Sequence, residues 1–195
     1  MADPGNLLEI DWSRLPVPTN DGAAHHLEGA PLADVALPSS AGGKISLAKL
    51  PGRTVLFIYP MTGTPGVALP DGWDAIPGAR GCTPHTCAFR DLHADLEAAG
   101  AAQVFGLSTQ TLAEQQATVE RLHLPFPLLS DDALGLTRAM SLPSMDVGGK
   151  TMIKRLALIL DDGVIVKVFY PVFPPDRNAG DVLAWLRANP RRLGT

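Results

Sequence analysis

Hydrophobic and polar positions along the chain alternate between a pattern typical of buried strands and one typical of helices that pack on them. The most apolar stretch is Thr54–Pro60, and its β-branched and aromatic residues predict a central strand that is buried on both faces. An apolar segment on each side of Asp161-Asp162-Gly163 predicts a hairpin. Further strands are predicted at residues 102–109, 126–131, 155–160 and 164–170.

Apolar residues at helical spacing predict four helices among these strands, at residues 84–99, 111–122, 133–140 and 179–188. Two short strands are expected near 31–37 and 42–47, and residues 143–150 are expected to form a glycine-containing loop. This order predicts an α/β fold of the thioredoxin-like type, with a mixed central sheet and helices on both faces.

Proline, glycine and polar residues divide the chain into an arm and one domain. With 195 residues, a single compact domain is expected. Residues 1–29, called the arm below, contain several helix- and strand-breaking residues and are predicted to be irregular. The domain is predicted to cover 30–195. Within it, residues 67–81 have few periodic apolar positions and are expected to form a long loop.

The composition excludes several classes of protein. A net charge of −4 argues against a nucleic-acid binder. No apolar run reaches the roughly 18 residues that a membrane-spanning helix needs. The amino-terminal residues show no positive segment followed by an apolar one, so no secretory signal is expected. We therefore expect a cytoplasmic protein, in which a close cysteine pair is more often catalytic than structural.

The candidate chemistry lies in Gly81–Asp91, which holds both cysteines of the chain, Cys82 and Cys87. Thr83-Pro84 predicts a helix start, with a hydroxyl residue at the cap and a proline at the first helical position. Cys82 is thus expected at or just before the amino end of a helix. The partial positive charge there favours a reactive thiolate.

The spacing of the two cysteines indicates how they can react. If one helix holds both, five residues separate them by a rise of roughly 7.5 Å and a rotation of about 140°. Bridged cysteines need Cα atoms within about 7 Å and converging Cβ vectors. The two cysteines cannot form a disulfide while the helix is intact. This suggests a redox-active pair rather than a structural disulfide. Two alternatives stay open: unrelated buried cysteines, or a zinc site with His85 and His93, although the spacing matches no standard zinc pattern.

Several motifs resemble one known family. The run Gly81-Cys82-Thr83-x-x-x-Cys87-x-Phe89-Arg90-Asp91 is similar to the active-site helix of the Q-type (bacterioferritin-comigratory) peroxiredoxins. Four other segments match the same family in the same order: Phe57–Pro60, Thr64–Gly66, Phe126–Asp131 and Arg155–Gly163. The resemblance covers roughly residues 30–189.

The resemblance implies residue roles. Cys82 would be the peroxidatic cysteine, and Cys87 the resolving one that forms an intramolecular disulfide with it. Pro60 and Thr64 would match the family's P-x-x-x-T, which shields the thiolate and orients the peroxide. Arg155 would face the same pocket.

The resemblance also implies an activity, that of a thioredoxin-dependent peroxidase. The substrate would be a hydroperoxide, and the reductant would be thioredoxin, or glutaredoxin with glutathione. No cofactor or metal, no nucleic acid and no membrane partner are expected. The protein would be a monomer or a homodimer.

The chain departs from the family in one place. In the family, P-x-x-x-T continues directly into x-x-C, whereas here residues 67–81, called the insert below, separate Thr64 from Cys82. We expect the insert to fold out as a lid or interface flap whose ends restore the pocket. Three other functions remain open: a thioredoxin-fold disulfide oxidoreductase or thiol redox sensor, a non-catalytic binding or chaperone module, and a metal-binding protein.

Overall fold

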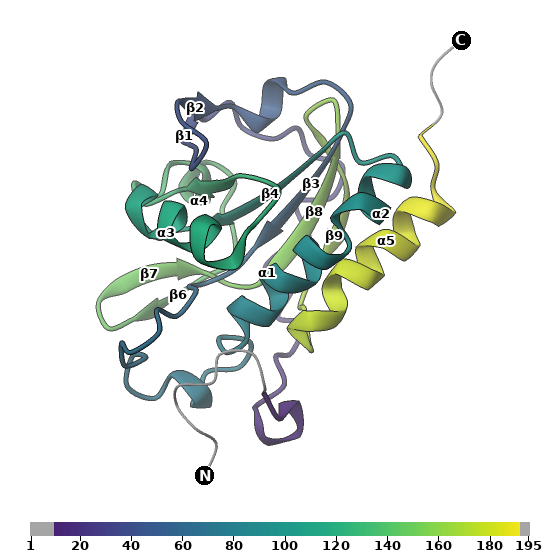
Figure 1. Cartoon of the computed structure of the whole chain (residues 1–195). Helices are drawn as coiled ribbons and strands as arrows, with labels where there is room; N and C mark the ends of the chain where they lie inside the picture. Colours follow the sequence, from purple (N-terminus) through teal and green to yellow (C-terminus); the bar gives the residue numbers. More distant parts are fainter. Residues whose placement is uncertain (1–9, 192–195) are drawn as a thin grey trace.

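A five-stranded mixed sheet forms the centre of the computed structural model, which describes residues 10–191 (Figure 1). In spatial order its strands are β5 (Leu128–Ser130), β4 (Gln103–Ser108), β3 (Arg53–Ile58), β8 (Leu156–Asp161) and β9 (Val164–Phe169). β3, β4 and β5 are parallel. β8 is antiparallel to β3 and forms the predicted hairpin with β9. The predicted mixed sheet is confirmed.

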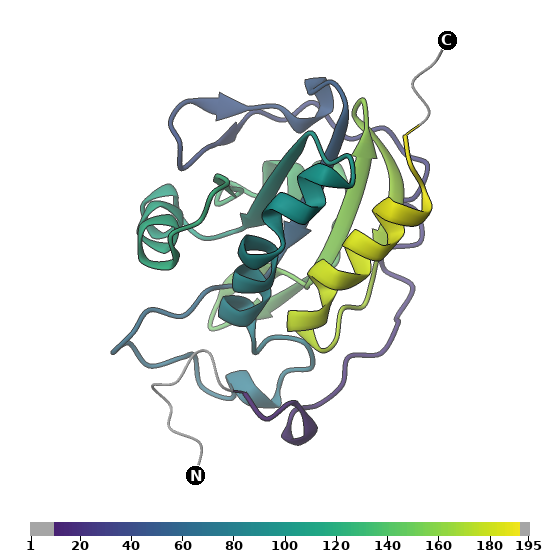
Figure 2. The ribbon, with the colours of Figure 1, turned by 45° about the vertical axis from the view of Figure 1, so that its right-hand side comes forward.

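Helices and loops cover both faces of this sheet. The helices are α1 (Cys82–Asp91), α2 (His93–Ala98), α3 (Leu112–Leu122), α4 (Gly135–Ala139) and α5 (Asn178–Ala188). α1, α2 and α5 lie side by side on one face, as Figures 1 and 2 show. The opposite face packs against α4 and apolar side chains from residues 24–50. Among residues 10–191, no helix is long and apolar enough to cross a membrane.

The central strand β3 is buried along its whole length. Val55 and Phe57 pack with the α1–α2–α5 side, and Leu56 and Ile58 pack with the other side. Because neither face of the strand meets water, its sequence is a continuous apolar run instead of an alternating one. The carboxyl end of β3 delivers the chain to Pro60 and to the region of the cysteines.

Several predicted elements differ from the structure, and the single helix predicted over 84–99 is divided at Leu92 into α1 and α2. Residues 143–150, expected as a loop, belong to a hairpin of β6 (Ser144–Val147) and β7 (Lys150–Ile153). Gly148 and Gly149 both have positive φ and form the tight turn of this hairpin. The two adjacent glycines are the reason why the sequence predicted a loop here. The short strands expected near 31–37 and 42–47 reduce to β1 (Leu37–Pro38) and β2 (Lys44–Ile45).

The described part of the arm packs against the domain. A short 3-10 helix spans Trp12–Arg14, and farther along Ala24 and Leu27 are buried in the core. Lys154 donates to the Asp21 carboxylate at 2.7 Å. The boundary between arm and domain at residue 30 stays a prediction, and residues 1–9 lie outside the described residues.

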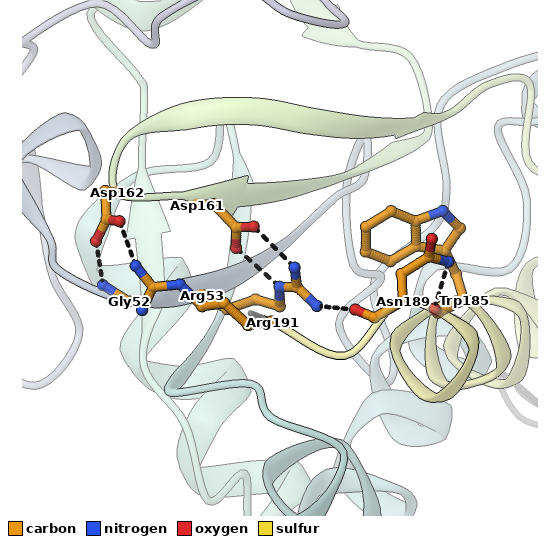
Figure 3. A network of polar contacts seen from close by, with 7 residues as sticks. All are labelled: Gly52, Arg53, Asp161, Asp162, Trp185, Asn189 and Arg191. Atoms are coloured by element: carbon orange, nitrogen blue, oxygen red, sulfur yellow. Dashed lines mark hydrogen bonds and ion pairs between the residues drawn. The ribbon is translucent and has the colours of Figure 1, made fainter. Parts of the chain in front are cut away.

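A polar network fixes the end of α5 to the amino end of β3 (Figure 3). Arg53 donates to the Asp161 carboxylate through Nε at 2.8 Å and through Nη2 at 2.7 Å. A third donor, Nη1, reaches the Asn189 carbonyl. The guanidinium lies over the Trp185 ring, 5.3 Å from its centroid. This network closes the core at the end of β3 remote from Pro60.

We predict that Arg53→Met lowers the free energy of unfolding by about 3 kcal/mol, because Asp161 and the Asn189 carbonyl lose a buried partner. Urea unfolding measures the change. Arg191→Met is the control, because it removes a more exposed pair with Asp162 and should cost less than about 1 kcal/mol. Equal losses in the two variants would contradict this account of the network.

Candidate active site

The amino end of α1 positions Cys82 as the first residue of the helix. Gly81 is the N-cap, with φ 99°, and makes no side-chain cap hydrogen bond. The expected cap at Thr83 is therefore wrong: the helix begins earlier, because Gly81 adopts a positive φ that a hydroxyl residue rarely takes. Helix geometry leaves the first backbone N–H groups of α1, those of Cys82 and Thr83, without intrahelical partners.

A buried guanidinium faces this sulfur. Arg155, immediately before β8, donates from Nη2 to Cys82 Sγ at 3.1 Å. The same nitrogen lies 3.1 Å from the Ala79 carbonyl and 3.2 Å from that of Arg80. Arg155 and Cys82 are each 3% exposed. Because an arginine stays charged at any working pH, a fixed positive charge lies within hydrogen-bond distance of this sulfur.

Sequence reasoning missed the contact of His85 with Arg155. Arg155 Nη1 is 2.8 Å from His85 Nδ1, and His85 Nε2 is 2.9 Å from Asn178 Oδ1. Burial, followed by the charge of Arg155, holds the pKa of His85 well below its usual value. The zinc alternative named His85 as a ligand, yet both of its ring nitrogens have protein partners. Within residues 10–191, no three His, Cys, Asp or Glu side chains gather as a metal site.

The arm and the insert cover Cys82. The cavity beside the sulfur measures about 10 Å³ and is lined by Ile10 of the arm and by Leu69 and Trp73 of the insert, among others. That volume holds roughly one water molecule. Trp73 is buried and packs with the β6–β7 hairpin through Met152. The insert therefore lies over the sulfur, in the position of a lid.

Trp12 of the arm lies against the helix start. A Cβ placed on Gly81 would be 2.6 Å from Trp12 Cη2 and 3.0 Å from Pro175 Cγ. The indole Nε1 of Trp12 donates to Asp176 Oδ2 at 3.1 Å, and its ring meets Phe173 edge-on at 6.2 Å. The arm is thus fixed by the segment before α5 onto the first turn of α1.

Pro60 and Thr64 occupy different surroundings. Pro60 is buried at the end of β3 and lines a larger, separate cavity of about 400 Å³. Thr64 is exposed. Of the described residues, Gly63 lines the small cavity at Cys82 and Thr64 does not. The structure thus does not bring Thr64 to the sulfur, and the roles of Pro60 and Thr64 stay predictions.

Cys87 lies farther along α1, and both cysteines are free and buried. Burial raises the pKa of the Cys87 thiol, against the opposing charge of Arg90. Cys87 packs in the cluster between α1 and the sheet that includes Tyr59 and Phe126. While α1 is intact, Cys87 is therefore a protonated, enclosed thiol on the same helix as Cys82.

Comparison with known proteins gives concordant results. The Redoxin family model matches residues 27–183. A chloroplastic peroxiredoxin Q of Triticum aestivum is 33% identical over 149 residues, which make up 75% of this chain and 60% of that protein. A Mycobacterium tuberculosis protein named as a peroxiredoxin is 33% identical over 164 residues, covering 82% of this chain and 96% of its own length.

Solved structures agree with these relatives. Peroxidoxin BcpB of Mycobacterium tuberculosis superposes with a TM-score of 0.66 at 30% identity, covering 83% of this chain and 96% of that one. Peroxiredoxin Q of Xanthomonas campestris gives 0.63 at 26% identity, with coverages of 89% and 96%. The chain belongs to the Redoxin family and has its thioredoxin-like fold. Within that family it is a peroxiredoxin of the Q type, which confirms the predicted class of oxidoreductase.

We predict that Gly81→Ala lowers the free energy of unfolding by about 2 kcal/mol, because a Cβ there meets the Trp12 ring and the positive φ is strained. Gly180→Ala is the control: it lies inside α5 with open space around it and should stabilise by about 0.5–1 kcal/mol. Thermal and urea unfolding measure both. An unchanged stability in Gly81→Ala would show that Trp12 does not rest on the helix start.

Proposed function

We propose that the chain is a thiol-dependent peroxidase that reduces hydroperoxides, with Cys82 as the nucleophile. The observation that carries this proposal is the Arg155 Nη2–Cys82 Sγ contact of 3.1 Å in a buried site at the amino end of α1. A positive charge and a helix amino end are the two environments that most favour a thiolate. Both meet at this sulfur.

In the first step, the Cys82 thiolate attacks one peroxide oxygen. An S–O bond forms and the O–O bond breaks, so that the sulfur becomes a sulfenic acid and the other oxygen leaves as water or an alcohol after taking a proton. Negative charge develops on the leaving oxygen. The Arg155 guanidinium and the unpartnered N–H groups of the first helical turn are the donors available to stabilise it.

In the second step, Cys87 attacks the sulfenic sulfur. An S–S bond forms and water leaves, which requires the first turns of α1 to unwind, because the intact helix holds the two side chains apart. Unwinding also moves Cys87 out of the core. Burial there raises the pKa of the Cys87 thiol. The thiol then ionises more readily and becomes nucleophilic. A dithiol partner, thioredoxin or glutaredoxin with glutathione, reduces the bridge by exchange.

The substrate must pass the arm and the insert. The cavity of about 10 Å³ is too small for an organic hydroperoxide, so Ile10 or Trp73 has to move during the cycle. A structure of the Xanthomonas campestris bacterioferritin comigratory protein concerns its alkyl peroxide reduction activity. This supports organic hydroperoxides, beside hydrogen peroxide, as substrates here. A cytoplasmic location and a monomeric or dimeric state remain predictions.

The second candidate, a disulfide oxidoreductase or redox sensor, is less well supported. A protein disulfide must reach the attacking sulfur directly, and Cys82 is 3% exposed under the arm and the insert. A small peroxide needs a much smaller displacement of the arm and the insert to reach Cys82. The same enclosure favours a peroxide over a protein as the first reactant.

The test is stopped-flow mixing of the reduced protein with hydrogen peroxide and with cumene hydroperoxide, followed by mass analysis of the thiols. We expect rapid loss of both thiols, a Cys82–Cys87 disulfide, and a trapped sulfenic acid at Cys82 in Cys87→Ser. Cys82→Ser should be inert. Rates no better than those of a free thiol would reject the peroxidase and favour disulfide exchange.

Thr64→Val tests whether the P-x-x-x-T threonine reaches the substrate when the loop moves. We predict about a tenfold lower rate of Cys82 oxidation, because one donor to the developing negative charge is lost. Thr62→Val is not a suitable comparison, since the Thr62 hydroxyl bonds to Gln110 inside the fold. Thr19→Val on the arm provides the control. An unchanged rate in Thr64→Val would mean that the insert has displaced Thr64 from the reaction.

A further inference from the structure

Arg155 is a buried charge whose partners are all neutral or sulfur. Its hydrogen bonds go to two backbone carbonyls, to Cys82 and to His85, and no ion pair among residues 10–191 includes it. A buried guanidinium is usually paired with a carboxylate. A carboxylate here would neutralise the charge that faces the sulfur. The structure holds Arg155 in place with an imidazole instead.

The hydrogen bonds of His85 define its protonation state. A guanidinium can only donate, so Nδ1 must accept from Arg155 Nη1. The proton therefore sits on Nε2, which donates to Asn178 Oδ1. The other neighbours are uncharged: the rings of Phe57 and Phe89 each meet the imidazole edge-on at 5.4 Å. Arg155 is thus the one charged group in contact with His85 among the described residues, and it opposes a second positive charge.

We propose that His85 is a positioning residue for the peroxidatic site: a neutral imidazole, oriented by Asn178 from α5, that directs Arg155 at Cys82 without neutralising its charge. The inference deepens the proposed function and rests on it. Asn178 sets the tautomer, because its Oδ1 accepts the Nε2 proton and leaves Nδ1 free to accept from Arg155. The start of α5 is thereby connected to the Cys82 sulfur through the side chains of Asn178, His85 and Arg155.

The arrangement predicts which change introduces a new pH dependence. Asn178→Asp places a carboxylate beside Nε2, which favours the imidazolium and raises the pKa of His85. Below that raised pKa, Nδ1 carries a proton and can no longer accept from Arg155. As the pH falls, Arg155 should then move away from Cys82, and the thiolate should lose the stabilising contact with the guanidinium. In the native protein His85 stays neutral, and this loss is absent near neutral pH.

The experiment measures alkylation of Cys82 by iodoacetamide between about pH 5 and pH 9, the range in which a histidine titrates, in a Cys87→Ser background. We expect Asn178→Asp to move the acid limb of the rate profile to higher pH. At the acid end, its rate should be about tenfold below that of the parent. Profiles that superimpose would overturn the proposal.

His85 variants separate positioning from folding. His85→Leu should slow alkylation and peroxide oxidation by about tenfold, because it leaves an Arg155 N–H without an acceptor. His85→Gln, whose amide can accept and donate as the imidazole does, should stay within about threefold of the parent. His93→Leu is the control, since His93 packs on Phe126 and pairs with Glu97. Wild-type rates in a folded His85→Leu protein would also overturn the proposal.

The two hypotheses fail separately. If peroxide oxidizes no variant rapidly, the proposed peroxidase is wrong, and the alkylation profiles still decide whether His85 and Asn178 direct Arg155. If His85→Leu does not fold, His85→Gln and Asn178→Asp provide the answer. Rescue by glutamine together with the new acid limb in Asn178→Asp supports positioning, since a residue that only fills the core would give neither.

Discussion

A guanidinium and a sulfur, both buried, face each other at 3.1 Å, and no carboxylate among residues 10–191 pairs with the guanidinium. The sulfur is thus the group that faces this buried positive charge. The rest of the site follows from keeping this pair in place. The residue immediately before β8 is the arginine, Gly81 allows α1 to begin at Cys82, and α5 contributes Asn178 behind His85. The apolar sheet gives all three elements a common support.

The helix that favours reaction of Cys82 also prevents Cys87 from bonding to it. Its amino end favours a thiolate, while its intact turns hold the two sulfurs apart. A cycle through an intramolecular disulfide must therefore give up the contacts of the first turn, including those to Trp12 and His85. In the proposed cycle, the arm and the insert would therefore act on one equilibrium, between an intact helix that reacts with peroxide and an unwound helix that forms the disulfide.

Much of the fold could be predicted from periodicity. The continuous apolar run at Thr54–Pro60 identified the central strand, and Asp161-Asp162-Gly163 identified the β8–β9 hairpin. The roles of Cys82, Cys87 and Arg155 came from resemblance, since C-x4-C alone is a weak pattern. The contact between His85 and Asn178 could not be found, because 93 residues separate them and only the packing of α5 on α1 brings them together. The same holds for Trp12 on Gly81.

The most direct test of the central claim is the thiolate absorbance of Cys82 near 240 nm as a function of pH, in Cys87→Ser with and without Arg155→Met. If the guanidinium stabilises the thiolate, the arginine protein holds its thiolate to lower pH than the methionine variant. Loss of one close opposite charge displaces such a curve by about 1–3 pH units. Coincident titration curves would contradict the claim, because the sulfur would then owe its ionisation to the helix alone.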